Sequence, residues 1–312
     1  MYNISIIGFG YWGKKLARNF QNSSYFEILS IVDKKKSNLV NAKKNLPMAE
    51  CYSDYKNAIK NDLIDLIVIS TPTSTHYNIA KFALENSKNI LVEKPLSLSL
   101  KQVNKLNKIA KSKKKMIFVD YPFLFSGTIN YIKKIIGQNK YGKILEIESF
   151  REQAPIRNDT NVIWDLTTHD ISILSYLLNK QPTSITTIKK ENIKKGLCDN
   201  IYINLKYSKG LNVLIKNSWI SPTKIRLIKI KFHKAILYCD ENESLYKIKI
   251  YKQKDKNIVS DYSLEIPEID LTEPLSKMTL YIYNSMQKNK NSLFGKDFNK
   301  KITMLLEKIN KS

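Results

Sequence analysis

The 312-residue sequence has little cysteine, little arginine and no long apolar run. Its three cysteines are odd in number and widely spaced, without a CxxC pair, so neither a disulfide framework nor a metal site is expected. No apolar run reaches the ~20 residues that cross a bilayer, and the N-terminus lacks the features of a secretory signal. We therefore expect a cytoplasmic protein with no membrane insertion.

The charge of the chain is one-sided, with a formal net charge of +24. Such a charge is one signature of nucleic-acid binding. Nearly all of it comes from scattered lysines, whereas arginine, which suits bidentate contacts with phosphates and bases, occurs at only four positions. The composition therefore favours a solvated basic surface, and no nucleic-acid partner is expected. Binding that weakens steeply with salt would support the alternative.

From residue 2 to about 120, short β-branched apolar runs alternate with amphipathic segments. The runs are ISIIGF, ILSIVD, IDLIVIS, NILVEK and KMIFVD. The helical segments are 12–20, 54–60, 77–85 and 100–111. Continuous apolar runs are typical of strands buried on both faces of a parallel sheet, and their alternation with helices predicts right-handed βαβ units. We expect a doubly wound α/β domain over residues 1–120.

Beyond residue 120 two helical segments, near 127–136 and 162–178, are followed by runs with a two-residue period. These runs are TSITTIKK, DNIYINLKY, LNVLIKNSW, KIRLIKIKF, KAILYCD and YKIKIYK. They predict an antiparallel sheet with one solvated face. Helical periodicity returns over 273–287 and 297–311. Residues 121–312 are therefore expected to form an α+β domain closed by two helices.

The first apolar run ends in a glycine-rich turn, Gly8-Phe-Gly10-Tyr-Trp-Gly13, which opens the first helix. Gly8 permits the tight turn, Gly10 lets the backbone approach a pyrophosphate, and Gly13 lets helix and strand pack closely. The free amides and the helix dipole then face the phosphates. The turn predicts a dinucleotide site, with Tyr11 and Trp12 as further cofactor contacts.

Asp33 ends the second apolar run, twenty residues after Gly13. At that position a carboxylate accepts hydrogen bonds from the adenosine ribose hydroxyls, which favours NAD over NADP. Two alternatives stay open. Asp33 could serve only to cap the next turn, and Lys34 and Lys35 could accommodate a 2′-phosphate.

The third and fourth apolar runs end in Thr71-Pro72 and Glu93-Lys94-Pro95. Because ligands bind at the carboxyl ends of the strands in an open α/β sheet, we expect both segments to contact the cofactor. Pro95 fixes the backbone at Lys94 and aims it into this crevice, although an ordinary surface lysine is the alternative. His76 falls in the first turn of the next helix and is assigned a packing or cofactor-adjacent role.

The segment VIWDLTTHD places Asp165 and His169 four residues apart, on one face of the first turns of a predicted helix. A histidine near a helix N-terminus tends towards the neutral form that a general base needs, and a nearby carboxylate can orient its ring. The alternative is that Asp165 caps the helix and His169 is a buried structural residue.

Together, GFGYWG, TPTxxH, EKP and WDLTTHD resemble the Gfo/Idh/MocA family, the glucose-fructose oxidoreductase and inositol dehydrogenase group, over nearly the whole chain. The resemblance implies an N-terminal Rossmann domain and a C-terminal domain whose open-faced antiparallel sheet serves substrate binding and oligomerisation. A homo-oligomer, dimer or tetramer, is expected. The resemblance also implies that Lys94, Asp165 and His169 are catalytic in hydride transfer between NAD and a secondary hydroxyl of a sugar or cyclitol.

The GFGYWG start and WDLTTHDISIL look closer to family members that oxidise nucleotide-linked amino sugars in surface-polysaccharide biosynthesis. A diphosphate-linked sugar suits Arg151 and Arg157 as phosphate partners. Tyr121, where many members have histidine, and Trp164 complete the expected substrate contacts. The alternatives are an inositol or free-sugar dehydrogenase, or a non-catalytic cofactor-binding regulator on the same fold.

Overall fold

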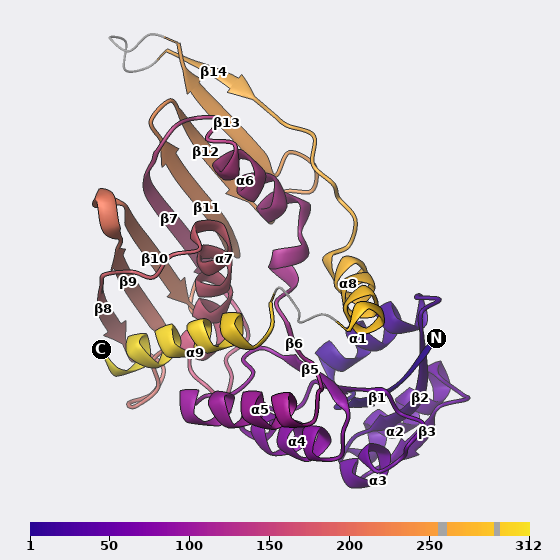
Figure 1. Cartoon of the computed structure of the whole chain (residues 1–312). Coiled ribbons are helices and arrows are strands. Elements are labelled where there is room, and N and C mark those ends of the chain that lie inside the picture. Colours follow the sequence, from indigo (N-terminus) through magenta and orange to yellow (C-terminus); the bar gives the residue numbers. More distant parts are fainter. Residues whose placement is uncertain (255–260, 290–293) are drawn as a thin grey trace. The chain divides into compact units, whose positions relative to one another are not determined.

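The computed structural model describes residues 1–254, 261–289 and 294–312, which form two compact units (Figure 1). The units comprise Met1–Pro122 with Glu273–Met304, and Phe123–Thr272 with Leu305–Ser312. The first unit thus includes a late segment that the sequence pattern grouped with the second domain. The physical reason is that helix α8 (Pro274–Lys288) packs against helix α1 (Tyr11–Gln21).

A six-stranded parallel sheet forms the centre of the first unit, in the order β3-β2-β1-β4-β5-β6. Its strands are β1 (Tyr2–Ile7), β2 (Phe26–Val32), β3 (Glu50–Tyr52), β4 (Leu66–Ile69), β5 (Asn89–Glu93) and β6 (Ile117–Asp120). This is the strand order of the doubly wound dinucleotide-binding fold, and it confirms the predicted fold class. The five apolar runs became strands. The three-residue β3 was not predicted because it is too short to show a periodicity.

Helices cover both faces of this sheet, with α1 and α8 on one side and α4 and α5 on the other (Figure 1). The helices of this unit besides α1 and α8 are α2 (Lys36–Asn45), α3 (Tyr55–Ile59), α4 (Thr73–Glu85) and α5 (Leu100–Ser112). Helix α9 (Lys296–Lys311) belongs to this unit as far as Met304 and to the second unit from Leu305. Helix α2 was not predicted because Ala42 is its one fully buried residue, so no apolar stripe marks it. Helix α4 starts at Thr73, directly after Pro72, so His76 lies near its start as expected, although the amphipathic pattern marked only residues 77–85.

The second unit contains an eight-stranded sheet in the order β14-β13-β12-β11-β7-β10-β9-β8. Its strands are β7 (Ile144–Glu152), β8 (Ser184–Lys190), β9 (Asn200–Lys206), β10 (Asn212–Ser218), β11 (Ile225–Phe232), β12 (Ala235–Asp240), β13 (Ile248–Gln253) and β14 (Tyr262–Glu265). The strand pairs are antiparallel except β7 with β10, which is parallel. The six predicted strands are present, whereas β7 and β14 were not predicted.

One face of this sheet is covered and the other is open. Helices α6 (Gly127–Gly137) and α7 (Thr168–Leu178) lie along the covered face (Figure 1). On β9, Ile201 and Ile203 are buried while Tyr202 between them is 42% exposed, so the predicted solvated face is present. The unit also contains the short helices η2 (Ile163–Thr167) and η3 (Ser208–Gly210), and the short helix η1 (Pro122–Phe125) begins at the last residue of the first unit's main segment. Over the described ranges, no helix has the length and apolar character needed to cross a membrane.

Candidate active site

The glycine-rich loop joins β1 to α1 and is held by the neighbouring strands. Gly8 has φ +96°, its amide donates to the Val32 carbonyl at 2.7 Å, and its carbonyl accepts from Ser70 Oγ at 2.7 Å. A Cβ at Gly8 would lie 2.5 Å from the Ser70 carbonyl oxygen, and one at Gly13 would lie 2.0 Å from the Gly8 carbonyl oxygen. Close backbone packing therefore requires both glycines.

Gly10 faces open space instead, since a Cβ there would have no described heavy atom within 4 Å. It is the N-cap of α1, which has no side-chain cap and no acidic residue in its first turn. Among the residues that the structure describes, no side chain caps the first amides of α1, and these amides with the positive end of the dipole are suited to an anion. The residues at this edge fit the pyrophosphate of the NAD expected from the sequence.

The next two residues, Tyr11 and Trp12, begin α1. Tyr11 is 77% exposed and Trp12 is half-buried. The ammonium nitrogen of Lys15 lies 4.5 Å from the centroid of the Tyr11 ring and 5.1 Å from that of Trp12. This cation–π arrangement holds both rings beside the start of the helix. Their expected contact with the cofactor stays a prediction.

Asp33 follows β2 and borders the same loop. Its Oδ2 accepts from the Phe9 amide at 2.7 Å and from Asn38 Nδ2 at 3.0 Å, and its Oδ1 accepts from the Lys35 amide at 2.8 Å. The turn-capping role that the sequence left open is therefore present. A carboxylate has about four lone-pair sites, so this half-exposed group keeps acceptor capacity for a ribose hydroxyl.

His76 joins the loops after β4 and β5. Its ring is fully buried, with Nε2 2.8 Å from the Thr71 carbonyl oxygen and Nδ1 2.8 Å from the Pro95 carbonyl oxygen. The residue after Thr71, Pro72, is exposed. The ring thus fixes the two segments that the sequence assigned to the cofactor, which is the packing role expected for this histidine.

Lys94 lies directly after β5 and is 5% exposed. Glu93 before it pairs in register with Asp120, the last residue of β6. Asp120 is fully buried, and its Oδ2 accepts a hydrogen bond from Trp12 Nε1. Burial raises the pKa of Asp120 to about 6, while the nearby Lys94 charge acts to lower it. Sequence reasoning missed Asp120, although an acidic residue at a strand end is the signal that identified Asp33.

Two of the expected substrate contacts are buried within their own units. Tyr121 is 2% exposed, its ring lies 5.8 Å from that of Phe298, and burial raises the pKa of its hydroxyl strongly. Trp164 is 6% exposed and lies in η2. The role assigned to each in substrate binding stays a prediction.

In the second unit, Asp165 lies in η2 and His169 in the first turn of α7. The sequence predicted regular α-helical spacing, but η2 is a π turn, a form that occurs often at functional sites. Asp165 is 7% exposed. Its Oδ2 accepts from Trp219 Nε1 at 2.9 Å, and its Oδ1 lies 3.5 Å from Arg157 Nη1. Trp219 gave no local sequence signal, because its partner lies 54 residues away.

Arg157 and Arg151 both bind carboxylates. Arg157 Nη2 lies 2.9 Å from Asp159 Oδ2, in addition to its contact with Asp165. Arg151 is 3% exposed and its Nε lies 3.4 Å from Asp170 Oδ1. The terminal nitrogens of Arg151 have no hydrogen-bond partner among the residues that the structure describes. The phosphate-binding role of both arginines stays a prediction.

A buried polar network surrounds Asp170, the neighbour of His169. Asp170 accepts from Ser149 Oγ at 2.8 Å and from Asn217 Nδ2 at 2.6 Å. Asn217 Oδ1 in turn accepts from Thr167 Oγ1 at 2.6 Å. These bonds fix the start of α7 against the covered face of the sheet, and hence the backbone at His169.

An aromatic contact links this network to the His169 ring. The Arg151 guanidinium carbon lies 4.4 Å from the centroid of the Phe123 ring, and the Phe123 ring lies 5.1 Å from that of His169 at 81°. Across the sheet, Arg226 pairs in register with Arg151. Burial and the Arg151 charge lower the pKa of Arg226 to about 10. Sequence reasoning missed Phe123, Asp170 and Arg226.

The predicted site residues thus gather at one place in each unit. In the first unit, the carboxyl edge of the parallel sheet brings together the glycine-rich loop, Asp33, Thr71-Pro72 and Glu93-Lys94. In the second unit, Asp165, His169 and the two arginines lie around the start of α7. Within the described residues, no three His, Cys, Asp or Glu side chains form a candidate metal site.

Together, this fold and these residues place the chain in the class of two-domain nicotinamide-dependent oxidoreductases. The model of an oxidoreductase family with an NAD-binding Rossmann fold matches residues 2–121, and the model of the GFO/IDH/MocA C-terminal domain matches residues 129–238. The chain belongs to the GFO/IDH/MocA family.

Curated relatives are similar at low identity. Myo-inositol 2-dehydrogenase of Thermotoga maritima is 25% identical over 69% of this chain and 68% of its own length. Inositol 2-dehydrogenase of Rhizobium meliloti is 27% identical over 50% of each protein. These alignments span about half to two thirds of the relatives' length.

Solved structures share the fold over nearly their whole length. Levoglucosan dehydrogenase in complex with NADH and levoglucosan has a TM-score of 0.86 at 15% identity, covering 100% of this chain and 96% of that chain. UDP-N-acetylglucosamine 3-dehydrogenase of Acidithiobacillus ferrooxidans has a TM-score of 0.85 at 16% identity, covering 98% and 96%. At these identities the likeness establishes the fold.

Proposed function

We propose that the chain transfers a hydride between NAD and a secondary alcohol of a sugar-like substrate. The observation that carries the proposal is the burial of Lys94, a charged residue, at the carboxyl edge of the NAD-binding sheet. A buried charge is costly, and such groups cluster at functional sites. The names of the inositol and levoglucosan dehydrogenases among the similar proteins support the same substrate class.

The proposal assigns a role in the reaction to three polar residues. His169 accepts the proton of the reacting hydroxyl at a ring nitrogen, as a general base. Lys94 donates a hydrogen bond from Nζ to the same oxygen and stabilises its developing negative charge. Asp165, held by Trp219 and Arg157, orients the substrate or the imidazole. NAD, when bound, accepts the hydride from the carbinol carbon.

Substitution of Lys94 tests the proposal, with a second buried lysine as control. Lys94→Met should lower kcat by about 100-fold or more while the Kd for NAD stays within about threefold. Lys88 lies directly before β5, whereas Lys94 lies directly after it. Lys88 is 6% exposed and donates a hydrogen bond to the Asn61 carbonyl at 2.7 Å. Lys88→Met should keep kcat within about threefold. Full activity of the Lys94 variant contradicts the proposal.

The finer substrate proposal is a nucleotide-linked amino sugar used in surface-polysaccharide biosynthesis. It is supported by the buried Arg151 guanidinium, a phosphate donor by its chemistry, and by the UDP-sugar dehydrogenase among the structures with this fold. UDP-sugars, inositols and free sugars should each be incubated with the protein and NAD or NADP, with absorbance of the reduced cofactor as the readout. Turnover of inositols alone supports the inositol alternative. Tight NAD binding without turnover of any of these compounds supports the alternative of a non-catalytic, cofactor-binding regulator.

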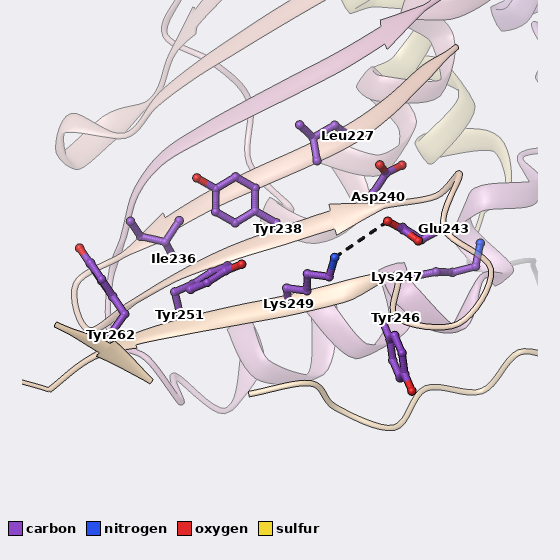
Figure 2. Close-up of a pocket in the computed structure, with 10 residues that line it drawn as sticks. All are labelled: Leu227, Ile236, Tyr238, Asp240, Glu243, Tyr246, Lys247, Lys249, Tyr251 and Tyr262. Carbon is purple, nitrogen blue, oxygen red and sulfur yellow. Dashed lines mark ion pairs between the residues drawn. The ribbon is translucent and has the colours of Figure 1, made fainter. Parts of the chain in front are cut away.

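The open face of the second sheet is the proposed contact between copies of the chain. Ile188 is 61% exposed, Tyr202 42% and Leu214 40%, on the neighbouring strands β8, β9 and β10. Farther along this face lies a hollow of about 460 Å³. Figure 2 shows the tyrosines that line it, Tyr238, Tyr246, Tyr251 and Tyr262. Exposed apolar area of this kind is typical of a protein interface.

Light scattering after size exclusion tests the interface. The unmodified protein should be a dimer or tetramer, and Leu214→Lys should shift it towards the monomer. Leu280 of α8 is 43% exposed and lies in the other unit, so Leu280→Lys is a matched control that should leave the mass unchanged. A monomeric unmodified protein overturns this part of the proposal.

A further inference from the structure

Asp120 is a buried carboxylate that the proposed reaction does not use. It ends β6 at the carboxyl edge of the parallel sheet and has no exposed surface. Its register partner on β5 is Glu93, and Lys94 is the next residue. Paired residues of parallel strands project to the same face, so two acidic side chains stand beside the strand end that carries Lys94. Burying a carboxylate there costs free energy, which a purely structural residue would avoid.

The two oxygens of Asp120 differ in their surroundings. Oδ2 accepts the hydrogen bond from the indole Nε1 of Trp12. Oδ1 is buried without a hydrogen-bond partner among the residues that the structure describes. The Lys94 charge is close enough to favour the charged form of Asp120. Asp120 therefore contacts the glycine-rich loop through one oxygen and acts on Lys94 through its charge.

We propose that Asp120 is a positioning residue that couples the glycine-rich loop to Lys94. Its hydrogen bond to Trp12 fixes the first turn of α1, where the cofactor phosphates bind, and its negative charge holds the Lys94 ammonium group in place. The proposal rests on the proposed function, since it takes Lys94 as the group that hydrogen-bonds the reacting oxygen. It adds a residue that the sequence patterns did not identify.

The coupling makes activity sensitive to acid. The ionisable residues beside Asp120 are Glu93, its register partner on β5, and Lys94, whose charge favours the charged form of Asp120. The neutral indole of Trp12 from α1 donates to its Oδ2. Burial raises the pKa of Asp120 to about 6, so protonation near that pH removes the negative charge beside Lys94. His169 as general base must also lose a proton. On the acid side of the pH profile, the loss of activity should therefore involve the binding of about two protons.

Two substitutions separate the charge of Asp120 from its hydrogen bond. Asp120→Asn keeps an oxygen for Trp12 and removes the charge, whereas Trp12→Phe keeps the charge and removes the donor. Asp120→Asn should lower kcat about tenfold or more, leave the Kd for NAD within about twofold, and reduce the acid limb to about one proton. Trp12→Phe should raise the Kd for the cofactor, measured by fluorescence titration with NADH, about fivefold or more, and should lower kcat less than Asp120→Asn does.

A matched control and a double variant complete the test. Asp65 precedes β4 at the opposite edge of the same sheet and accepts from the Asn3 amide at 2.8 Å. Asp65→Asn should keep both kcat and the pH profile. In a Lys94→Met background, Asp120→Asn should lower the residual activity by less than about twofold, because the two residues act as one unit.

The outcomes distinguish this inference from the proposed function. A fully active Lys94→Met overturns the proposed function whatever Asp120 does. An inactive Lys94→Met together with an Asp120→Asn variant that matches Asp65→Asn in kcat and pH profile overturns the coupling alone. An Asp120→Asn variant that changes only the Kd for NAD also overturns it, because the carboxylate would then act through Trp12 and not through Lys94.

Discussion

The indole Nε1 of Trp219 donates a hydrogen bond to Oδ2 of Asp165 over 2.9 Å. Trp219 is 3% exposed and follows β10, so the donor is fixed by the sheet. The other carboxylate oxygen of Asp165 lies near Arg157, at 3.5 Å. The orientation of Asp165 is therefore set from two sides by groups that are far from it in the sequence.

Removing this donor should impair both catalysis and stability. Trp219→Phe leaves a buried carboxylate oxygen without its partner, at a cost of about 1–3 kcal/mol, and kcat should fall about tenfold with the Kd for NAD unchanged. Tyr141→Phe is the control, since it removes a hydrogen bond of 3.0 Å to Glu265 in the same unit. Equal kcat values for both variants count against a role of Trp219 in orienting Asp165.

Two glycines of the same loop should respond differently to alanine. Gly13→Ala places a Cβ 2.0 Å from the Gly8 carbonyl oxygen and should lower the free energy of unfolding by about 1–3 kcal/mol or more. Gly10→Ala meets no described atom within 4 Å and should leave the apoprotein's stability unchanged. It should nevertheless raise the Kd for NAD about tenfold, because the methyl group occupies space needed by the pyrophosphate. Urea unfolding and NADH fluorescence measure the two effects, and unchanged NAD affinity in Gly10→Ala contradicts the assigned cradle.

The first unit could be predicted from the sequence because its signals are local. Each central strand is a continuous apolar run, and Gly8 and Asp33 follow strands directly. Asp120 has the same kind of signal at the end of β6, but its partner Trp12 lies 108 residues away. A strand end can be recognised from neighbouring residues, whereas the burial that makes a carboxylate unusual depends on the folded core.

The second unit was harder to predict because its order depends on distant pairing. Strand β7 pairs parallel with β10 and antiparallel with β11, and neither partner is near it in the sequence. Its alternation of apolar and acidic residues carries no turn signal that would place it between them. The π turn at Asp165 likewise follows from contacts such as the one with Trp219, not from the DxxxH spacing.

The Phe123 ring should control the position of His169, the proposed general base. It lies between the Arg151 guanidinium, at 4.4 Å, and the His169 ring, at 5.1 Å. Phe123→Leu keeps an apolar side chain but loses both ring contacts, and kcat/KM should fall about five- to tenfold. Phe232→Leu, a change in the same unit next to Tyr141, is the control. The two variants should have comparable melting temperatures. An unchanged kcat/KM in Phe123→Leu shows that the ring does not position His169.

Asp120→Asn should make the protein more stable at neutral pH while making it less active. The pKa of Asp120 is raised from 3.8 to about 6, so the folded state binds a proton between these values that the unfolded state has released. Stability therefore falls as the pH rises through this window, and the charged form costs about 3 kcal/mol above pH 6. The neutral amide avoids this cost. Urea unfolding should give the variant and the unmodified protein similar free energies near pH 4 and favour the variant by about 2–3 kcal/mol near pH 7.5. A difference that does not change with pH means that the carboxylate of Asp120 is not buried as a charge.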